Sequence, residues 1–241
     1  AVAASCSRLG LGVGADRVVL SSSTSEAYSY LFRLLADPGD SFLVPTPSYP
    51  LFEHLARLDA LHAVPYRLDP EAHWRVDLGS LEEAPASTRG LILVHPNNPT
   101  GSYVHPDDAD HLARLCADRG WALVADEVFL PFPLNPPAGT TRSFAGRSDS
   151  LTFTLGGLSK SVGLPQMKLA WTVVSGPEPA VVEALARLEH IADAYLSVAT
   201  PTALAARRWL EMGGTVRAAI THRCRHNLDA LLALAERLPA V

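Results

Sequence analysis

The feature that most constrains the fold is an alternation of short apolar runs with longer amphipathic stretches between residues 17 and 174. Seven apolar, β-branched runs predict strands, at 17–20, 41–45, 62–66, 91–96, 121–128, 150–155 and 169–174. Helical spacing of apolar residues predicts helices between them, at 25–36, 49–60 and 107–120. Strands separated by helices indicate βαβ units. We therefore predict a three-layer α/β/α fold around a mainly parallel sheet.

The end of the chain has a different pattern. Three helical stretches follow one another there, at 179–195, 202–212 and 215–238, without an intervening strand. The segment 131–149 is rich in Pro, Gly and Ser, and we predict a loop rather than a domain boundary because strand pattern resumes directly after it.

The composition excludes several classes of protein. Hydrophobic residues make up 48% of the chain and charged residues 19%, which is enough apolar material for a packed core. The net charge of -5 does not favour nucleic acid or an anionic membrane as a partner, because both select basic surfaces. No apolar run approaches membrane-spanning length. Three scattered cysteines make a poor disulfide framework and no zinc knuckle, so we expect a cytoplasmic protein.

Lysine is rare in this chain. Among 20 basic residues, only Lys160 and Lys168 are lysines, and they lie eight positions apart. High-GC codon usage accounts for the excess of arginine, but it does not account for where the two exceptions fall. Lysine forms Schiff bases and arginine does not, so the pair predicts amine chemistry in this segment.

Polar residues follow several predicted strands, at the edge of a parallel sheet where ligands bind. Residues 21–28, SSSTSEAY, offer hydroxyls and free N–H groups at a helix start, which suits a phosphate, although plain helix capping is the commoner explanation. Tyr49 lies between two prolines after the strand 41–45 and can stack on a planar ring, although core packing is the plainer explanation.

Three further strand ends carry polar groups. Asn97 and Asn98 each offer a donor and an acceptor in the turn after the strand 91–96. Asp126 ends a buried strand, where a carboxylate needs a cationic partner. A loop cap and a metal ligand are the other readings of Asp126, and the metal is disfavoured because no ligand follows at suitable spacing. Lys160 follows a glycine pair in an apolar run, which argues against a solvated lysine.

We predict no metal site elsewhere. His222, Cys224 and His226 lie on a predicted amphipathic helix, where surface positions are the simpler explanation.

Taken together, these motifs resemble the fold-type I, class I and II aminotransferases, whose cofactor is pyridoxal 5'-phosphate. The resemblance covers about residues 17–175, with the motifs in the order the family has them. It rests on NNPTG at 97–101, ADEV at 125–128, LSK at 158–160 and GLPQMKLAW at 163–171.

The resemblance implies a role for each candidate residue. Lys160 would form the Schiff base and move the proton between substrate and cofactor. Asp126 would keep the pyridine nitrogen protonated, Asn98 would hydrogen-bond the ring O3′, and Tyr49 would stack on the ring. The cofactor phosphate would be held by the remaining five residues, namely Ser23, Thr24, Ser25, Ser159 and Lys168.

Three positions depart from the family pattern. Phe129 stands where the family usually has tyrosine, and we expect a higher pKa of the cofactor imine and weaker cofactor retention. Lys168 stands where arginine is usual, so it supplies charge without a bidentate fork. Gly157 stands where many relatives have a phosphate-binding serine.

The resemblance also implies that family members are longer at both ends. We therefore predict that residues 1–241 are an incomplete large cofactor-binding domain, whose helical part 178–241 leads to a small C-terminal domain outside the chain. We assign no arginine to the substrate carboxylate, because none of the arginines lies in the matching motif. The intact protein is expected to be a homodimer.

The leading functional prediction is transfer of an amino group from an L-amino acid to a 2-oxo acid. A carbon–sulfur lyase or a decarboxylase would use the same motifs. A ligand-sensing domain of the same fold is the non-catalytic alternative. An unrelated α/β domain that binds a phosphorylated metabolite is a further alternative.

Overall fold

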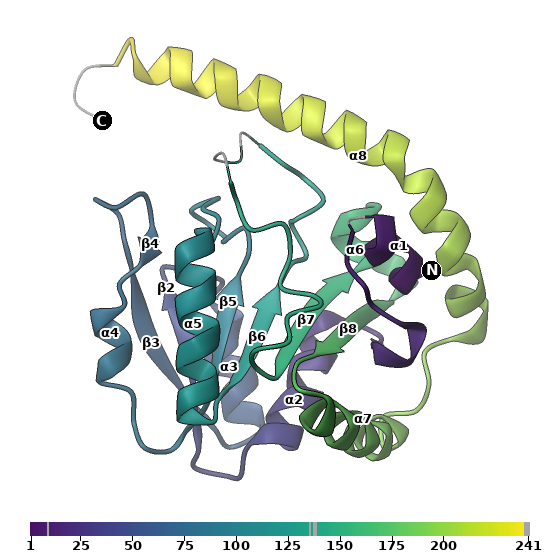
Figure 1. The fold of residues 1–241 in the computed structure, drawn as a ribbon. Helices are drawn as coiled ribbons and strands as arrows, with labels where there is room; N and C mark the ends of the chain where they lie inside the picture. Colours follow the sequence, from purple (N-terminus) through teal and green to yellow (C-terminus); the bar gives the residue numbers. More distant parts are fainter. Residues whose placement is uncertain (9, 135, 137–138, 239–241) are drawn as a thin grey trace.

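The computed structural model describes residues 1–8, 10–134, 136 and 139–238. An eight-stranded sheet with the order β1-β8-β7-β6-β5-β2-β3-β4 forms the centre of the molecule (Figure 1). In chain order the strands are β1 (Val18–Ser21), β2 (Ser41–Thr46), β3 (His62–Asp69), β4 (Arg75–Val76), β5 (Thr88–Val94), β6 (Ala122–Asp126), β7 (Thr152–Gly157) and β8 (Ala170–Ser175). The seven predicted strands are therefore present, and only the two-residue β4 was not expected, because so short a strand has no detectable period.

The sheet is mainly parallel, as predicted. Strands β3, β2, β5, β6 and β7 run parallel to one another. Strand β8 runs antiparallel to both β7 and β1, and β4 runs antiparallel to β3. The last residue of β7, Gly157, pairs with the first residue of β8, Ala170. The segment just before β8 therefore reaches the same edge of the sheet as the carboxyl ends of the parallel strands.

Helices cover both faces of the sheet, which confirms the three-layer prediction. The α-helices are α1 (Val2–Arg8), α2 (Thr24–Leu35), α3 (Leu51–Leu58), α4 (Gly79–Glu82), α5 (Pro106–Arg119), α6 (Leu158–Ser161), α7 (Glu178–Asp193) and α8 (Thr200–Ala235). Helices α2, α3 and α7 pack on one face, and α4 and α5 pack on the other.

Alternate residues of the central strands serve the two cores. Ile92 of β5 and Val124 of β6 point to the α2 side, whereas Leu91 and Leu123 point to the α5 side. Because both faces are buried, these strands read as nearly continuous apolar runs in the sequence.

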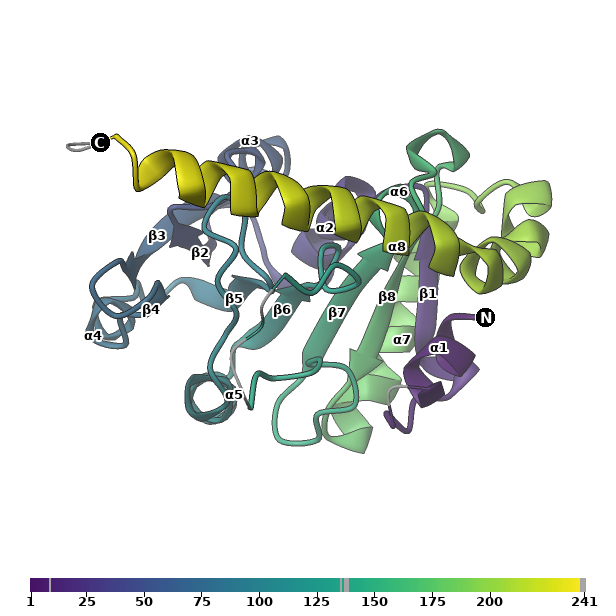
Figure 2. The ribbon, with the colours of Figure 1, turned by 90° about the horizontal axis from the view of Figure 1, so that it is seen from above.

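Helix α8 corrects one expectation. The stretches 202–212 and 215–238, which have separate periods in the sequence, are joined in a single helix of 36 residues that ends at Ala235. Gly213 lies inside this helix, where an added Cβ would clash with Cγ1 of Val162, just after α6. Gly213 is therefore a point of close contact, and the Gly-Gly pair does not break the helix. Viewed from the side and from above, α8 crosses over the ends of the central strands (Figures 1 and 2).

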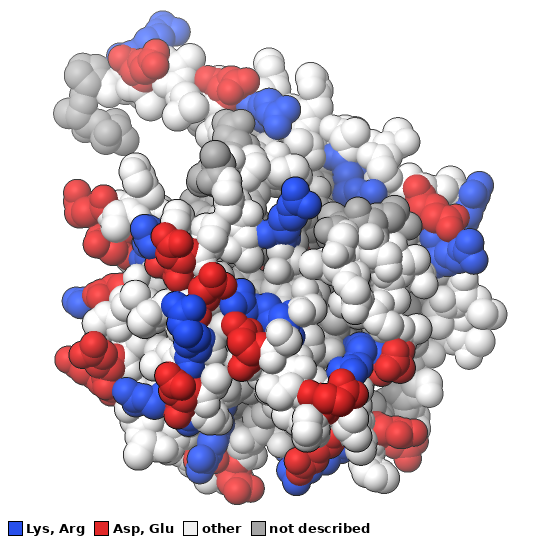
Figure 3. All heavy atoms as spheres, viewed as in Figure 1, with Lys and Arg blue, Asp and Glu red and all other residues white. Residues whose placement is uncertain are grey.

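The segment 131–149 contains no helix or strand in the part that the structure describes, namely 131–134, 136 and 139–149, in agreement with the predicted loop. Across the described residues, every helix, α8 included, is too short or too polar to traverse a lipid bilayer. On the face shown in Figure 3, acidic and basic side chains are interspersed over α4 and α5, whereas the surface beneath α8 is mostly uncharged with isolated basic groups.

Candidate functional site

A cavity of about 290 Å³ lies at the carboxyl edge of the sheet, where β5, β6 and β7 end and β8 begins. All nine residues predicted from the sequence line it, namely Ser23, Thr24, Ser25, Tyr49, Asn98, Asp126, Ser159, Lys160 and Lys168. We call this space the site cavity. The fold brings these residues together from five separate segments, while the role of each remains a prediction.

The start of α2 forms one wall of the site cavity. Ser23 is the N-cap residue, and its Oγ accepts the N–H of Glu26 at 3.1 Å. The Glu26 carboxylate in turn accepts the N–H and the hydroxyl of Ser22, at 2.6 and 2.7 Å. The Ser23 hydroxyl is thus used for capping. The backbone N–H groups of Thr24 and Ser25 come before the first intrahelical bond, from Ala27 N to Ser23 O, and have no acceptor within the helix.

Asp126 ends β6 as a buried carboxylate that has two neutral donors. Oδ1 accepts the N–H of Val128 at 3.2 Å, and Oδ2 accepts the hydroxyl of Tyr28 at 3.0 Å. Burial raises the pKa of Asp126 to about 6, and the two hydrogen bonds oppose that rise. Among the described residues it has no cationic partner, so this carboxylate is suited to accept a further N–H donor from a ligand.

Lys160 lies on α6, directly after β7, and its side chain is exposed. This differs from the expectation of a shielded lysine. The apolar neighbour Leu158 is buried, but the short helix turns Lys160 outward into the open cavity. Its Nζ lies 5.7 Å from the ring centroid of Phe129.

Lys168 approaches the site cavity from the other side, immediately before β8. It is exposed and adopts a left-handed backbone conformation, with φ 49°. All ion pairs found within the described ranges use arginine or histidine as the cation. Both lysines of the chain are therefore uncommitted to carboxylates in this part of the structure.

The adjacent asparagines act differently. Asn97 is buried, and its Nδ2 donates to Pro47 O at 3.0 Å and to Thr100 Oγ1 at 2.9 Å, while its Oδ1 accepts the hydroxyl of Ser48 at 3.0 Å. It thereby ties the loop after β2 to the loop after β5. The Asn98 side chain has no hydrogen-bond partner among the described residues and lines the site cavity.

Tyr49 directly follows Ser48, one of the two residues of the β2 loop that Asn97 binds. Its ring lies perpendicular to that of Phe52, with the centroids 6.5 Å apart, and 48% of Tyr49 is exposed. A half-exposed aromatic face beside the cavity is available for stacking.

A second cavity of about 400 Å³ adjoins the site cavity and shares Asn98, Phe129, Ser159 and Lys160 with it. Ile220 of α8 bounds it on the far side. The long helix therefore forms part of the wall of the space next to Lys160.

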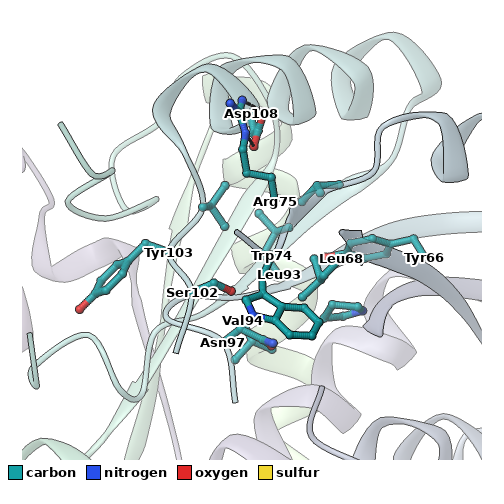
Figure 4. Close-up of a pocket in the computed structure, with 13 residues that line it drawn as sticks. Tyr66, Leu68, Trp74, Arg75, Leu93, Val94, Asn97, Ser102, Tyr103 and Asp108 are labelled. Atoms are coloured by element: carbon teal, nitrogen blue, oxygen red, sulfur yellow. Dashed lines mark hydrogen bonds and ion pairs between the residues drawn. The ribbon is translucent and has the colours of Figure 1, made fainter. Parts of the chain in front are cut away.

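A third space, drawn in Figure 4, has a different character. It measures about 20 Å³, which is room for about one water molecule. Arg75 beside it forms an ion pair with Asp108 of α5, with Nε 2.9 Å from Oδ2. This space is a packing gap on the α5 side of the sheet and offers no room for a metabolite.

The family model of class I and II aminotransferases matches residues 5–234. The chain belongs to this aminotransferase family. Among curated proteins, nicotianamine aminotransferase 1 of Oryza sativa is 29% identical over 196 residues, covering 79% of this chain and 38% of the relative. Glutamate-pyruvate aminotransferase AlaA of Haemophilus influenzae is 27% identical over 192 residues, covering 79% and 47%.

Solved aminotransferase structures have the same fold. Alanine aminotransferase of Pyrococcus furiosus superposes with a TM-score of 0.85 at 20% identity, covering 97% of this chain and 59% of that one. Tyrosine aminotransferase of Leishmania infantum gives a TM-score of 0.79 at 22% identity, covering 90% and 58%. The chain thus spans less than half the length of the two curated relatives and less than two thirds of these structures.

The three departures from the family pattern all lie on the site cavity. Phe129 also bounds the adjoining cavity. A Cβ at Gly157 would come within 3.3 Å of both Leu169 O and the Cβ of Ala170. Because β8 lies this close, a serine at position 157 would require the strand to move slightly.

Sequence reasoning missed Tyr28, the donor to Asp126. It lies at the end of the segment SSSTSEAY, in which only the serine and threonine hydroxyls were interpreted as functional groups. The available signal was its position on the apolar face of a helix, since a buried tyrosine hydroxyl requires a partner.

Proposed function

We propose that the complete protein transfers an amino group from an L-amino acid to a 2-oxo acid, with pyridoxal 5'-phosphate as its cofactor. The observation that carries this proposal is that Lys160 and Asp126 line the same cavity in a chain of the aminotransferase family. An amine and a carboxylate on one cavity match the aldehyde and the ring nitrogen at opposite sides of the cofactor.

The residues present offer suitable partners for the ring nitrogen, the ring oxygen and the phosphate of the cofactor. The buried carboxylate of Asp126 lacks a cationic partner among the described residues. Asn98 has a free amide, and Lys168 has a free ammonium, within the same part of the chain. The two N–H groups at the start of α2 that have no acceptor within the helix would bind an anion.

When bound, the cofactor supplies an electron sink for charge that develops at the substrate Cα. Asp126 would accept the ring N–H and keep that nitrogen positively charged. Thr24, Ser25, Ser159 and Lys168 would hold the phosphate, and Tyr49 would cover one face of the ring. The Asn98 amide would donate to the ring oxygen.

Lys160 would have two tasks. Its amine would hold the cofactor covalently at the aldehyde carbon until an amino acid takes its place. The free amine would then remove and return the proton at the substrate Cα. Its open position beside Phe129, with no carboxylate partner among the described residues, supports this role.

We also infer a homodimeric, cytoplasmic protein with a further small domain after α8. The resemblance to the family supports the dimer and the extra domain, and the scattered cysteines support the compartment.

The decisive experiment loads the protein with cofactor, reduces it with borohydride and maps the modified peptide by mass spectrometry. We expect the label on Lys160. Lys160→Ala should lose both the label and the visible absorption band, whereas Lys168→Ala should keep the label on Lys160 and bind the cofactor more weakly. A label on Lys168, or none in the wild type, would contradict the proposal.

The reaction type needs a second measurement, made on the complete protein. An aminotransferase forms 2-oxo acid continuously only when an amino acceptor is present. A carbon–sulfur lyase or a decarboxylase would form its product without an acceptor, and that result would replace amino transfer by one of these reactions.

A further inference from the structure

The hydroxyl of Tyr28 reaches from α2 to the carboxylate at the end of β6. It lies 3.0 Å from Oδ2 of Asp126, and both residues are buried, with 3% of Tyr28 and 8% of Asp126 exposed. Among the described residues, the carboxylate has one other donor, the N–H of Val128. Of these two donors, only the Tyr28 hydroxyl is a side-chain group, so only it can be removed by substitution without altering the backbone at the strand end.

Packing holds the Tyr28 ring in place. Phe52 of α3 contacts it nearly edge-on, with centroids 5.3 Å apart and an interplanar angle of 75°. Phe32, one turn further along α2, lies 6.0 Å away. The hydroxyl has no other hydrogen-bond partner among the described residues, so its direction is set by the ring and by Asp126.

Burial, reinforced by the nearby Asp126 charge, raises the pKa of Tyr28 well above its ordinary range, so the hydroxyl stays protonated and acts as a donor. A donor to the ionised form of a carboxyl group lowers its pKa. Tyr28 therefore opposes the effect of burial on Asp126.

Several other titratable groups near Asp126 have hydrogen-bond partners of their own, although the Asp126 charge also contributes to the raised pKa of Glu127. The Glu127 carboxylate accepts the N–H of Phe144 and the hydroxyl of Ser143. The ring of His95, whose backbone N–H donates to Asp126 O, lies between Thr141 O and Val104 N. Tyr66 of β3 donates to Ile92 O. The two lysines line the same site cavity as Asp126, and neither forms an ion pair with it in the described part of the structure.

We propose that Tyr28 is a positioning residue, which keeps Asp126 ionised and holds its carboxylate in the orientation that receives the ring nitrogen of the cofactor. The inference rests on the proposed function, since it assigns Tyr28 to the Asp126 end of that site. Tyr28 acts through Asp126 and does not itself line the cavity.

The test compares Tyr28→Phe with Tyr66→Phe, a matched loss of one buried tyrosine hydroxyl that does not touch Asp126. In cofactor-free protein, the pKa of Asp126 is followed by NMR of carboxyl-labelled aspartate. We expect Tyr28→Phe to raise this pKa and Tyr66→Phe to leave it unchanged. An unchanged Asp126 pKa in folded Tyr28→Phe would overturn the proposal.

Cofactor binding gives an independent measurement. We expect Tyr28→Phe to weaken binding about tenfold, because a hydrogen bond to a charged group is lost. The pH below which affinity declines should move upward. In an Asp126→Asn background, the same substitution should change affinity little, and an equal loss in both backgrounds would show that Tyr28 acts only through packing.

Two outcomes separate this inference from the proposed function. Wild-type protein that binds no cofactor contradicts the proposed function, while the titration of cofactor-free protein still decides whether Tyr28 controls Asp126. If Tyr28→Phe does not fold, wild-type protein made with fluorotyrosine, which has a stronger hydroxyl donor, must show a lower Asp126 pKa, and no change overturns the inference.

Discussion

Adjacent residues at the strand ends have different tasks because successive side chains of a strand point to opposite faces. Asp126 points to α2 and to the site cavity, whereas Glu127 points to the loop that contains Ser143 and Phe144. Asn97 and Asn98, in the turn after β5, also differ: the Asn97 side chain binds two loops together, whereas the Asn98 side chain has no hydrogen-bond partner among the described residues. A shift of one position would exchange a structural group for one that faces a ligand.

Phe129 is the residue whose replacement should improve the site. Phe129→Tyr adds one hydroxyl to the wall shared by the two cavities, close to Lys160 and Asn98. We expect cofactor binding to become roughly threefold to tenfold tighter, through one added hydrogen bond. Absorbance titration with the cofactor measures this. Phe132→Tyr, which adds the same group to the adjoining cavity alone, is the control, and weaker binding by Phe129→Tyr would count against the assignment.

At the scale of elements, α8 and α6 are coupled at one glycine. An added Cβ at Gly213 would clash with Val162 and lie 3.0 Å from the Arg217 guanidinium, which itself donates to Ser161 O at 3.0 Å. A Cβ at Gly214 would meet only a distant atom of Arg217, at 3.9 Å. The long helix α8 therefore contacts the end of α6, the short helix that carries Lys160, and a shift of α8 would displace it.

The two glycines form a matched pair for substitution. Gly214→Ala should stabilise the protein by about 0.5–1 kcal/mol, because alanine is the better helix former. Gly213→Ala should instead lower stability by about 1–3 kcal/mol, because it overfills a closed contact. Urea unfolding measures both changes. Equal effects of the two substitutions would mean that the contact between Gly213 and Val162 is not tightly packed.

The sequence predicted most elements because parallel strands buried on both faces leave long apolar runs, such as LILV before Asn97. It also predicted the residues that line the site cavity, since polar groups after such runs stand out. It did not predict the direction of β8 or the continuity of α8 through Gly213, because both depend on contacts between distant segments. The exposure of Lys160 and the bond from Tyr28 to Asp126 likewise depend on tertiary packing.

At the scale of the whole molecule, two buried carboxyl groups link stability to pH. Burial raises the pKa of Glu127 to about 8 and that of Asp126 to about 6. The folded protein therefore retains protons that the unfolded chain has already released, and stability falls as the pH rises from about 4, the ordinary range of a carboxyl group, up to these values. Burial lowers the pKa of His95 to about 4, which reduces stability as the pH falls below its ordinary range.

Replacement of Glu127 should make the stability of the protein less dependent on pH above about 5. Glu127→Gln keeps an acceptor for Phe144 N–H and gains a donor for Ser143, but it cannot release a proton. We expect its unfolding temperature to change less than that of the wild type between pH about 5 and about 8. The exposed Glu83→Gln is the control and should follow the wild type. A parallel decline in Glu127→Gln would mean that this carboxyl group is already ionised in the folded protein.

Because β8 runs antiparallel to β7, a short connection joins the two strands, and its length limits which sequence changes the site can accept. Lys160 and Lys168 lie on one short crossing between two paired strands, so their separation is fixed by the length of that connection. Side chains there can be exchanged one at a time, as lysine for arginine at 168. An insertion or a deletion would move one positive charge relative to the other, so sequence length in this stretch should be the most strictly kept property of the site.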